Sequence, residues 1–159
     1  MDDKLYCVYN SQPGRVLVYR EKGMWDSVDE CGFAALTDGG PWEYGEMRGG
    51  ANIVGHAGEF YHFFHSMQII AGVLVYYVGC YTFDARMRVS RLTRLPLLHG
   101  SIEEMTRPWK SRVPIAACFP CGCIRDKDTW LLSYGWLAST LRLASIPDTE
   151  LQDALFPLR

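Results

Sequence analysis

Short runs of aromatic and β-branched residues recur along the chain, and this recurrence constrains the fold more than any other feature. The runs follow one another at spacings of roughly 8 to 12 residues, with polar turns between them, as antiparallel strands do in sandwiches and propellers. Aromatic residues make up 13% of the 159 residues and Gly occurs 15 times. This composition favours strands and turns over long helices. We therefore predict an all-β fold.

The pattern predicts individual elements. Residues 5–10 and 15–20 form a hairpin around the turn SQPG, and residues 21–50 form a long loop with one short strand. Strands are expected in 52–66, which contains the turn GHAG, in 73–85, in 90–100 up to Pro96, in a second hairpin over 113–136 with the turn RDKD, and lastly in 139–147. Residues 101–112 read as a polar connector. Residues 148–159 predict a short helix stopped by Pro157.

Hairpins begin near residues 4, 50 and 112, a repeat of roughly 50 to 60 residues that is typical of propeller blades. We predict one partial β-propeller domain over 1–159, with blade-like units near 4–47, 48–111 and 112–151. Three blades cannot close a ring, and an open propeller exposes strand edges. The ring is therefore expected to be completed by more chain or by a second copy, as a homo-oligomer.

The charge balance excludes some partners. Sixteen basic and 18 acidic residues give a formal charge of -2, so no bulk field attracts nucleic acid or an anionic membrane. No apolar run reaches the roughly 18 residues of a membrane helix, and the first residues lack the pattern of a signal peptide. We expect a cytoplasmic protein with reduced cysteines and no nucleic-acid or membrane partner.

The segment CFPCGC, residues 118–123, resembles a ligand cluster. Cys118 and Cys121 form half of a zinc site, but no second C-x-x-C or H-x-x-x-H lies at a suitable distance. A redox dithiol needs a helix N-terminus, whereas these flanks predict a strand. A buried strand with packing cysteines is the favoured interpretation, and a zinc or redox site that uses Cys118, Cys121 and Cys123 is the alternative.

Two further patterns carry polar chemistry. Arg48 precedes two glycines, so a guanidinium that suits phosphate or carboxylate lies beside a backbone that can approach a ligand, although an ordinary surface turn has the same pattern. His62 and His65 are three residues apart in a predicted strand. They therefore point to opposite faces and cannot bind one metal together.

The order of the motifs resembles the second half of the five-bladed β-propellers of glycoside hydrolase family 130, which comprises β-mannoside phosphorylases and related hydrolases. The resemblance covers almost the whole chain. The matching residues are Phe64, His65 and Ser66; Tyr77, Gly79 and Asp84; Ser90, Arg91, Pro96 and Leu97; Phe119 to Gly122; and Tyr134 and Gly135.

The resemblance implies a glycan-active propeller with an axial pocket for a β-linked hexoside, no cofactor, and inorganic phosphate as a co-substrate. His65 matches the phosphate-contacting histidine of that pattern, and we expect Arg48, His65 and Tyr134 at loop edges around the pocket.

The chain also departs from the family. The family's catalytic aspartate and arginine-rich element lie in the first two blades, so no acidic residue here corresponds to the general acid. Ala138 replaces a sugar-contacting aspartate in YGWLAST, and Ala51 and Asn52 replace Thr and Pro. The chain alone is therefore expected to be inactive without a missing N-terminal half. A non-catalytic sugar-binding or scaffold propeller is the alternative function.

Overall fold

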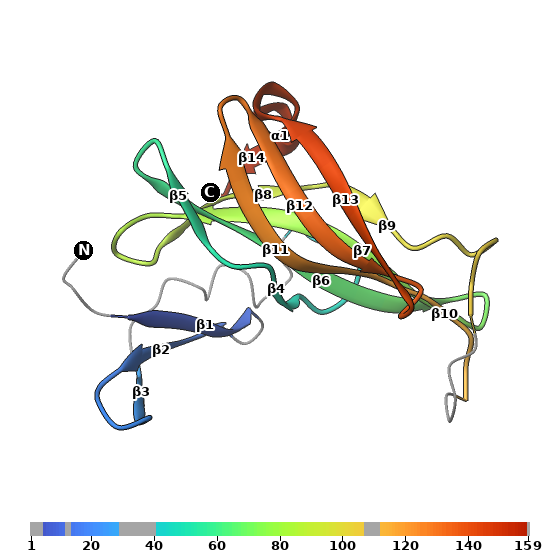
Figure 1. The fold of residues 1–159 in the computed structure, drawn as a ribbon, viewed down its shortest axis with the longest axis horizontal. Helices are drawn as coiled ribbons and strands as arrows, with labels where there is room; N and C mark the ends of the chain where they lie inside the picture. The colour runs from blue at the N-terminus through green and yellow to red at the C-terminus, as the bar shows by residue number, and fades with distance from the viewer. Residues whose placement is uncertain (1–4, 12–13, 29–40, 107–111, 159) are drawn as a thin grey trace.

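The computed structural model describes residues 5–11, 14–28, 41–106 and 112–158. The described chain forms three β-sheets (Figure 1). An all-β fold is therefore confirmed. No helix in these ranges is long and apolar enough to span a membrane.

The first sheet contains the predicted hairpin, which is confirmed. Its strands, all antiparallel, are β1 (Tyr6–Ser11), β2 (Gly14–Tyr19) and β3 (Trp25–Ser27). The predicted long loop thus contains β3 and, near its end, β4 (Arg48–Gly50). Its residues 29–40, which include Cys31, lie outside the described residues.

The central sheet is built on a long hairpin of β6 (Glu59–Ile70) and β7 (Val73–Phe83), both predicted. The main path runs β14-β8-β7-β6-β4. Short strands extend this sheet, and the parallel β10 is the exception to its antiparallel pairing. They are β5 (Val54–His56), β8 (Val89–Thr93), β9 (Leu98–His99), β10 (Ile115–Ala116) and β14 (Leu155–Pro157).

The third sheet consists of β11 (Cys118–Asp126), β12 (Thr129–Trp136) and β13 (Thr140–Pro147), with antiparallel pairing throughout. This confirms the second predicted hairpin and the strand in 139–147. The latter is not the last strand, because helix α1 (Asp148–Ala154) and β14 follow it. The helix ends three residues before Pro157, which instead pairs with Arg91 at the edge of the central sheet, where a proline is tolerated.

The central sheet is buried on both faces, because side chains of β6 alternate between two cores. Tyr61 and Phe63 pack towards β11, β12 and α1 together with Trp130 and Leu151. Phe64 belongs to the core on the other face, which includes Val16, Trp42 and Tyr81.

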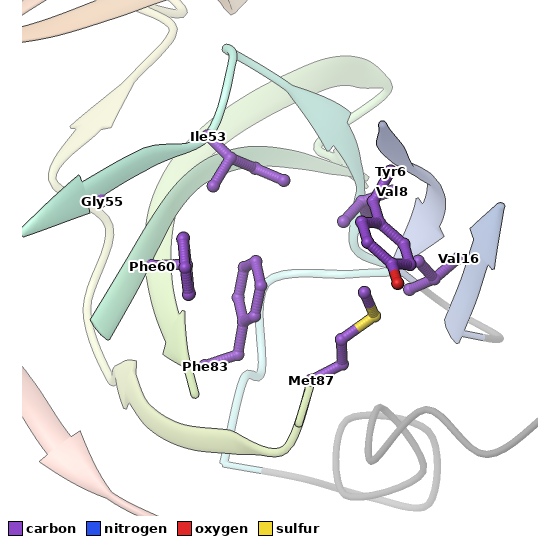
Figure 2. A pocket seen from close by; sticks show the side chains of 8 residues that line it. All are labelled: Tyr6, Val8, Val16, Ile53, Gly55, Phe60, Phe83 and Met87. Carbon is purple, nitrogen blue, oxygen red and sulfur yellow. The ribbon is translucent and has the colours of Figure 1, made fainter. Parts of the chain in front are cut away.

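The second core contains an apolar cavity of about 210 Å³ (Figure 2). Phe60 and Phe83 stack with ring centroids 5.4 Å apart on the side of the central sheet, and Tyr6, Val8 and Val16 face them from the first hairpin. The first sheet thus meets the central sheet with less complete packing than a filled core.

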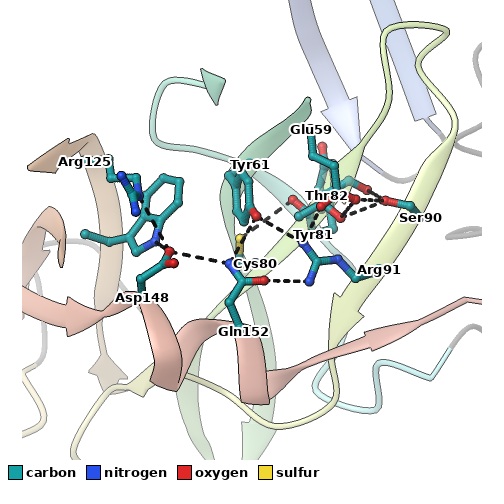
Figure 3. A network of polar contacts seen from close by, with 11 residues as sticks. Glu59, Tyr61, Cys80, Tyr81, Thr82, Ser90, Arg91, Arg125, Asp148 and Gln152 are labelled. Atoms are coloured by element: carbon teal, nitrogen blue, oxygen red, sulfur yellow. Dashed lines mark hydrogen bonds and ion pairs between the residues drawn. The ribbon is translucent and has the colours of Figure 1, made fainter. Parts of the chain in front are cut away.

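Helix α1 is tied to the central sheet by a polar network (Figure 3). Arg91 donates to Gln152 Oε1 at 2.7 Å, and Gln152 Nε2 donates to the Tyr61 hydroxyl at 3.1 Å. At the start of the helix, Trp130 Nε1 donates to Asp148 Oδ1 at 2.7 Å. These bonds hold residues 148–157 against strands that lie far away in the sequence.

Candidate functional site

The three sheets approach one another at β4, which lies beside both β1 and β11. Gly50 makes this approach possible, since a Cβ there would lie 2.1 Å from the Phe63 carbonyl oxygen and 2.9 Å from Pro120 Cγ. At Gly49 the corresponding Cβ would meet no atom within 4 Å. The glycine pair therefore allows one close packing contact and leaves open space at the neighbouring residue.

Two of the three predicted site residues lie together here. Arg48 begins β4 and pairs in register with His65 of β6. The Arg48 side chain is 46% exposed and forms an ion pair with Glu46 at 3.2 Å. The guanidinium is thus available to solvent directly beside the imidazole.

His65 is buried, and its tautomer follows from one contact. Its Nδ1 bonds to the carbonyl oxygen of Gly49, and a carbonyl can only accept, so Nδ1 carries the proton. Nε2 has no hydrogen-bond partner among the described residues, yet it is not a buried unpaired atom. It is therefore open to solvent as an acceptor when the ring is neutral.

The environment favours that neutral form. Burial lowers the pKa of His65, the bond to Gly49 partly opposes this effect, and the charge of Arg48 lowers the pKa further. The ring is stacked against Tyr76 with centroids 5.8 Å apart, and the Phe119 ring lies 4.4 Å away. The imidazole is thus held in one orientation by aromatic neighbours.

Tyr134 lies on β12, packed against the core between the central and third sheets, with its ring 6.3 Å from that of Trp136. No described contact joins it to Arg48 or His65. His65 and Tyr134 lie within strands rather than at loop edges, whereas Arg48 is the first residue of β4. Strands β4 and β6 pair through Arg48 and His65 themselves.

Phe119 and Asn52 occupy motif positions in the sequence, but neither is predicted to have a place in the site. Phe119 is 40% exposed beside His65, and Asn52 bonds the backbone of Cys123. Alternation along CFPCGC signals that Phe119 and Cys118 point in opposite directions. No local signal shows that His65 lies next to this ring, because 54 positions separate the two residues.

Two of the three cysteines of CFPCGC, Cys118 and Cys123, act as packing residues. Cys118 and Cys123 are buried and Cys121 is exposed, and a bulge interrupts the strand between Pro120 and Gly122. Burial raises the pKa of both Cys118 and Cys123 to about 12, so these thiols stay protonated at neutral pH. Among the described residues no three His, Cys, Asp or Glu side chains are grouped so as to hold a metal ion.

His62 lies on the face of β6 opposite to His65, within the second core. Its Nδ1 and the Tyr81 hydroxyl form a hydrogen bond of 2.6 Å. Its ring also bonds the backbone of Ala51. Burial lowers the pKa of His62 to about 4. This histidine is a neutral core residue.

Glu59 is a partly buried carboxylate in the network of Figure 3, and its surroundings keep it ionised. Burial alone would raise its pKa, but hydrogen bonds from Ser90, Arg91 and Thr82 and the charge of Arg91 outweigh that effect and lower the pKa. A carboxylate held in this form is a poor proton donor.

Comparisons with known proteins identify the fold. No family model matches the chain, and no curated protein matches its sequence. Among solved structures, a candidate glycoside hydrolase from Parabacteroides distasonis matches 94% of this chain, with a TM-score of 0.64 and 14% identity. The β-1,2-mannobiose phosphorylase from Listeria innocua matches 97% of this chain, with a TM-score of 0.62 and 14% identity. A glycosyl hydrolase from Bacteroides ovatus matches 100% of this chain, with a TM-score of 0.61 and 13% identity.

The chain spans less than half the length of these three structures, namely 46%, 43% and 46%. At such low identity the likeness concerns the fold. The fold of this chain is therefore shared with glycoside hydrolase-like proteins, including a mannobiose phosphorylase.

Proposed function

We propose that the three sheets are consecutive blades of a propeller of the family 130 type, and that the chain contributes one side of a pocket for β-linked hexosides. The ordered motifs and the shared fold support this proposal. So does the meeting of β1, β4 and β11, since inner strands surround the axis of a propeller.

One observation supports a sugar as the ligand of this site. Exposed Arg48 lies opposite His65, and exposed Phe119 lies beside His65. A guanidinium donates to hydroxyl oxygens, and neutral Nε2 accepts from a hydroxyl group. The half-exposed phenyl ring offers an apolar surface to the C–H face of a hexose. Together these groups match the alternating polar and apolar surface of a sugar.

The same geometry supports a phosphate contact at Arg48 rather than at His65. Because Nδ1 is occupied by the Gly49 carbonyl, Nε2 can donate to an oxyanion only when the ring is protonated. The lowered pKa disfavours that state at neutral pH. We thus revise the role of His65 from phosphate donor to hydroxyl acceptor.

The chain alone is proposed to bind without turnover. Glu59 is held ionised, and Ala138 lies exposed in the turn between β12 and β13, where it offers no carboxylate. Hydrolysis or phosphorolysis then requires a general acid from an N-terminal half or a partner. Without that group the chain is a sugar-binding or scaffold propeller, and this second function is favoured by the missing carboxylate at Ala138.

Calorimetric titration with β-1,2-mannobiose tests the proposal. His65→Ala and Arg48→Ala should each weaken binding about tenfold or more, as expected for one lost charge-assisted or buried hydrogen bond. Arg20→Ala is the matched control, since Arg20 is also exposed and forms an ion pair with Asp26 in the first sheet. Equal affinity of all variants would contradict the site, and turnover of an aryl β-mannoside by this chain would contradict the missing acid.

A further inference from the structure

A second hollow lies on the face of the central sheet that carries the second core. It has a volume of about 610 Å³, within the range of small-molecule sites. Val75 and Tyr77 of β7 belong to its lining, and Tyr77 also packs at the margin of the second core. We call this hollow the Tyr77 cleft; it is lined by Tyr44, Val75, Tyr77, Leu95, Pro96, His99, Gly100, Ser101, Ile102 and Glu103.

One wall of the Tyr77 cleft is fixed by a buried hydroxyl. Ser66 is fully buried, accepts a hydrogen bond from Trp42 Nε1 at 2.8 Å, and donates to the Tyr44 carbonyl at 2.7 Å. Gly45 next to it packs against the backbone of Met67, where a Cβ would lie 2.2 Å from the carbonyl oxygen. Tyr44 is therefore held in place before any ligand arrives.

The opposite wall is fixed by Gly100. Its N–H donates to the Tyr76 carbonyl at 2.8 Å, and a Cβ at this position would lie 1.8 Å from the Ala116 carbonyl oxygen. His99 pairs in register with Tyr77, so their side chains lie on one face of the sheet. The cleft is thus built from two rigid walls on a strand floor.

Two polar groups of the Tyr77 cleft can accept hydrogen bonds, beside the hydroxyls of Tyr44, Tyr77 and Ser101, which can both donate and accept. His99 Nδ1 bonds to the Gly100 carbonyl at 3.1 Å and must donate, so the neutral ring presents Nε2 as an acceptor. The Glu103 carboxylate is exposed and has no ion pair within the described part of the chain. The imidazole nitrogen and the carboxylate therefore suit a ligand that brings donors.

The charge and the rings of the cleft favour a cation. Of the described residues that line it, none is Lys or Arg, and the nearby Arg94 places its guanidinium over the Phe156 ring, 4.3 Å from the centroid. Tyr44 and Tyr77 meet with centroids 5.1 Å apart at 50°, forming an aromatic corner. The negative faces of such rings attract ammonium and guanidinium groups.

We propose that the Tyr77 cleft binds an organic cation, an ammonium or guanidinium group on an aliphatic stem. The head group lies against the Tyr44–Tyr77 corner and Glu103, and the stem packs on Val75, Pro96 and Ile102. Leu95 and Ile102 are exposed, which supplies the apolar surface for the stem.

Three probes of matched shape test the proposal at pH 8: n-butylammonium, butan-1-ol and butanoate, each titrated while the NMR signals of Tyr44 and Tyr77 are followed. We expect saturable shifts with the cation alone. Glu103→Gln should weaken binding about fivefold, the effect of losing one exposed charge contact. Glu150→Gln, at an exposed position of α1, should leave it unchanged.

Tyr44→Leu is a second variant, which keeps an apolar side chain and removes the ring. It should abolish the saturable shifts while the remaining spectrum stays folded. Equal binding of butan-1-ol, stronger binding of butanoate, or an unchanged affinity in Glu103→Gln would overturn the proposal. Saturable shifts in this cleft with methyl β-mannoside but not with n-butylammonium would overturn it in favour of a sugar site.

Discussion

The side-chain amide of Asn52 pairs with the backbone of Cys123 through two hydrogen bonds. Its Nδ2 donates to the Cys123 carbonyl at 2.9 Å, and its Oδ1 accepts from the Cys123 N–H at 2.8 Å. The amide thus occupies the place of a neighbouring strand beside β11, just after its bulge. This pairing joins the central sheet to the third sheet by polar contacts as well as by the core.

Asn52→Ala should lower the free energy of unfolding by about 2 kcal/mol, because both backbone groups of Cys123 lose their partner. Urea denaturation measures the change. Ser139→Ala is the control, since Ser139 lies exposed in the turn after β12, and its stability should stay within about 0.5 kcal/mol of the wild type. A loss in Asn52→Ala no larger than in the control would show that the amide pair contributes nothing.

The same substitution should affect stability strongly at one of the adjacent glycines of β4 and weakly at the other. Gly50→Ala forces a Cβ to 2.1 Å from the Phe63 carbonyl oxygen, so β4 must move and stability should fall by about 2 kcal/mol or more. Gly49→Ala meets open space and should change stability by less than about 1 kcal/mol. Thermal unfolding of the two variants compares them directly, and similar melting temperatures would refute the packing described for Gly50.

Buried His62 should make the protein sensitive to mild acid. Its pKa is about 4 in the folded state against 6.5 for the free side chain, so the unfolded state binds the proton more tightly. The contribution of neutral His62 to the free energy of unfolding is complete above pH 6.5. It is lost as the pH falls from 6.5 towards 4, and the total loss is about 3 kcal/mol. Urea denaturation at pH 8, 6.5, 5.5 and 4.5 measures how the free energy of unfolding changes with pH.

The comparison variant is His62→Gln, which cannot titrate and should be less stable at pH 8 but flatter between pH 6.5 and 4.5. His99→Gln serves as the control, since His99 is exposed. If wild type and His62→Gln show parallel slopes, the buried neutral state of His62 is wrong.

The cysteines should differ in reactivity. Cys121 is exposed, whereas burial keeps Cys80, Cys118 and Cys123 protonated and inaccessible. Brief treatment of the folded protein with iodoacetamide, followed by peptide mass mapping, should show modification at Cys121 and none at the three buried thiols until urea is added. Rapid labelling of Cys118 in the folded protein would instead restore the redox interpretation of CFPCGC.

The sequence predicted the elements whose information is local. The hairpins over 5–20 and 113–136 carry alternating side chains and recognisable turns, and both formed as expected. Strand β14 was not predicted, and β10 was predicted only as the start of the second hairpin, because strands of two or three residues show no periodicity and their pairing with β7 and β8 depends on distant segments.

The candidate site was predictable only in part, for the same reason. The pattern identified Arg48 and His65 as polar groups of interest, and their register on β4 and β6 brought them together. The tautomer of His65 and its contact with Phe119 arise from tertiary packing of β11, which no spacing encodes. Tyr134 shares a motif with them but no described contact, so its place in the site stays a prediction.

The late arrival of β14 has a consequence for synthesis. Residues 155–157 pair with β8 and form the last strand at that edge of the central sheet. Gln152 of α1 adds hydrogen bonds with Tyr61 and Arg91. On the ribosome β8 must therefore wait, with its outer edge unpaired, until about 60 further residues have been made, roughly 3 to 12 seconds at ordinary rates of elongation. During that interval a chaperone that covers exposed strand edges would have its best opportunity to bind the nascent chain.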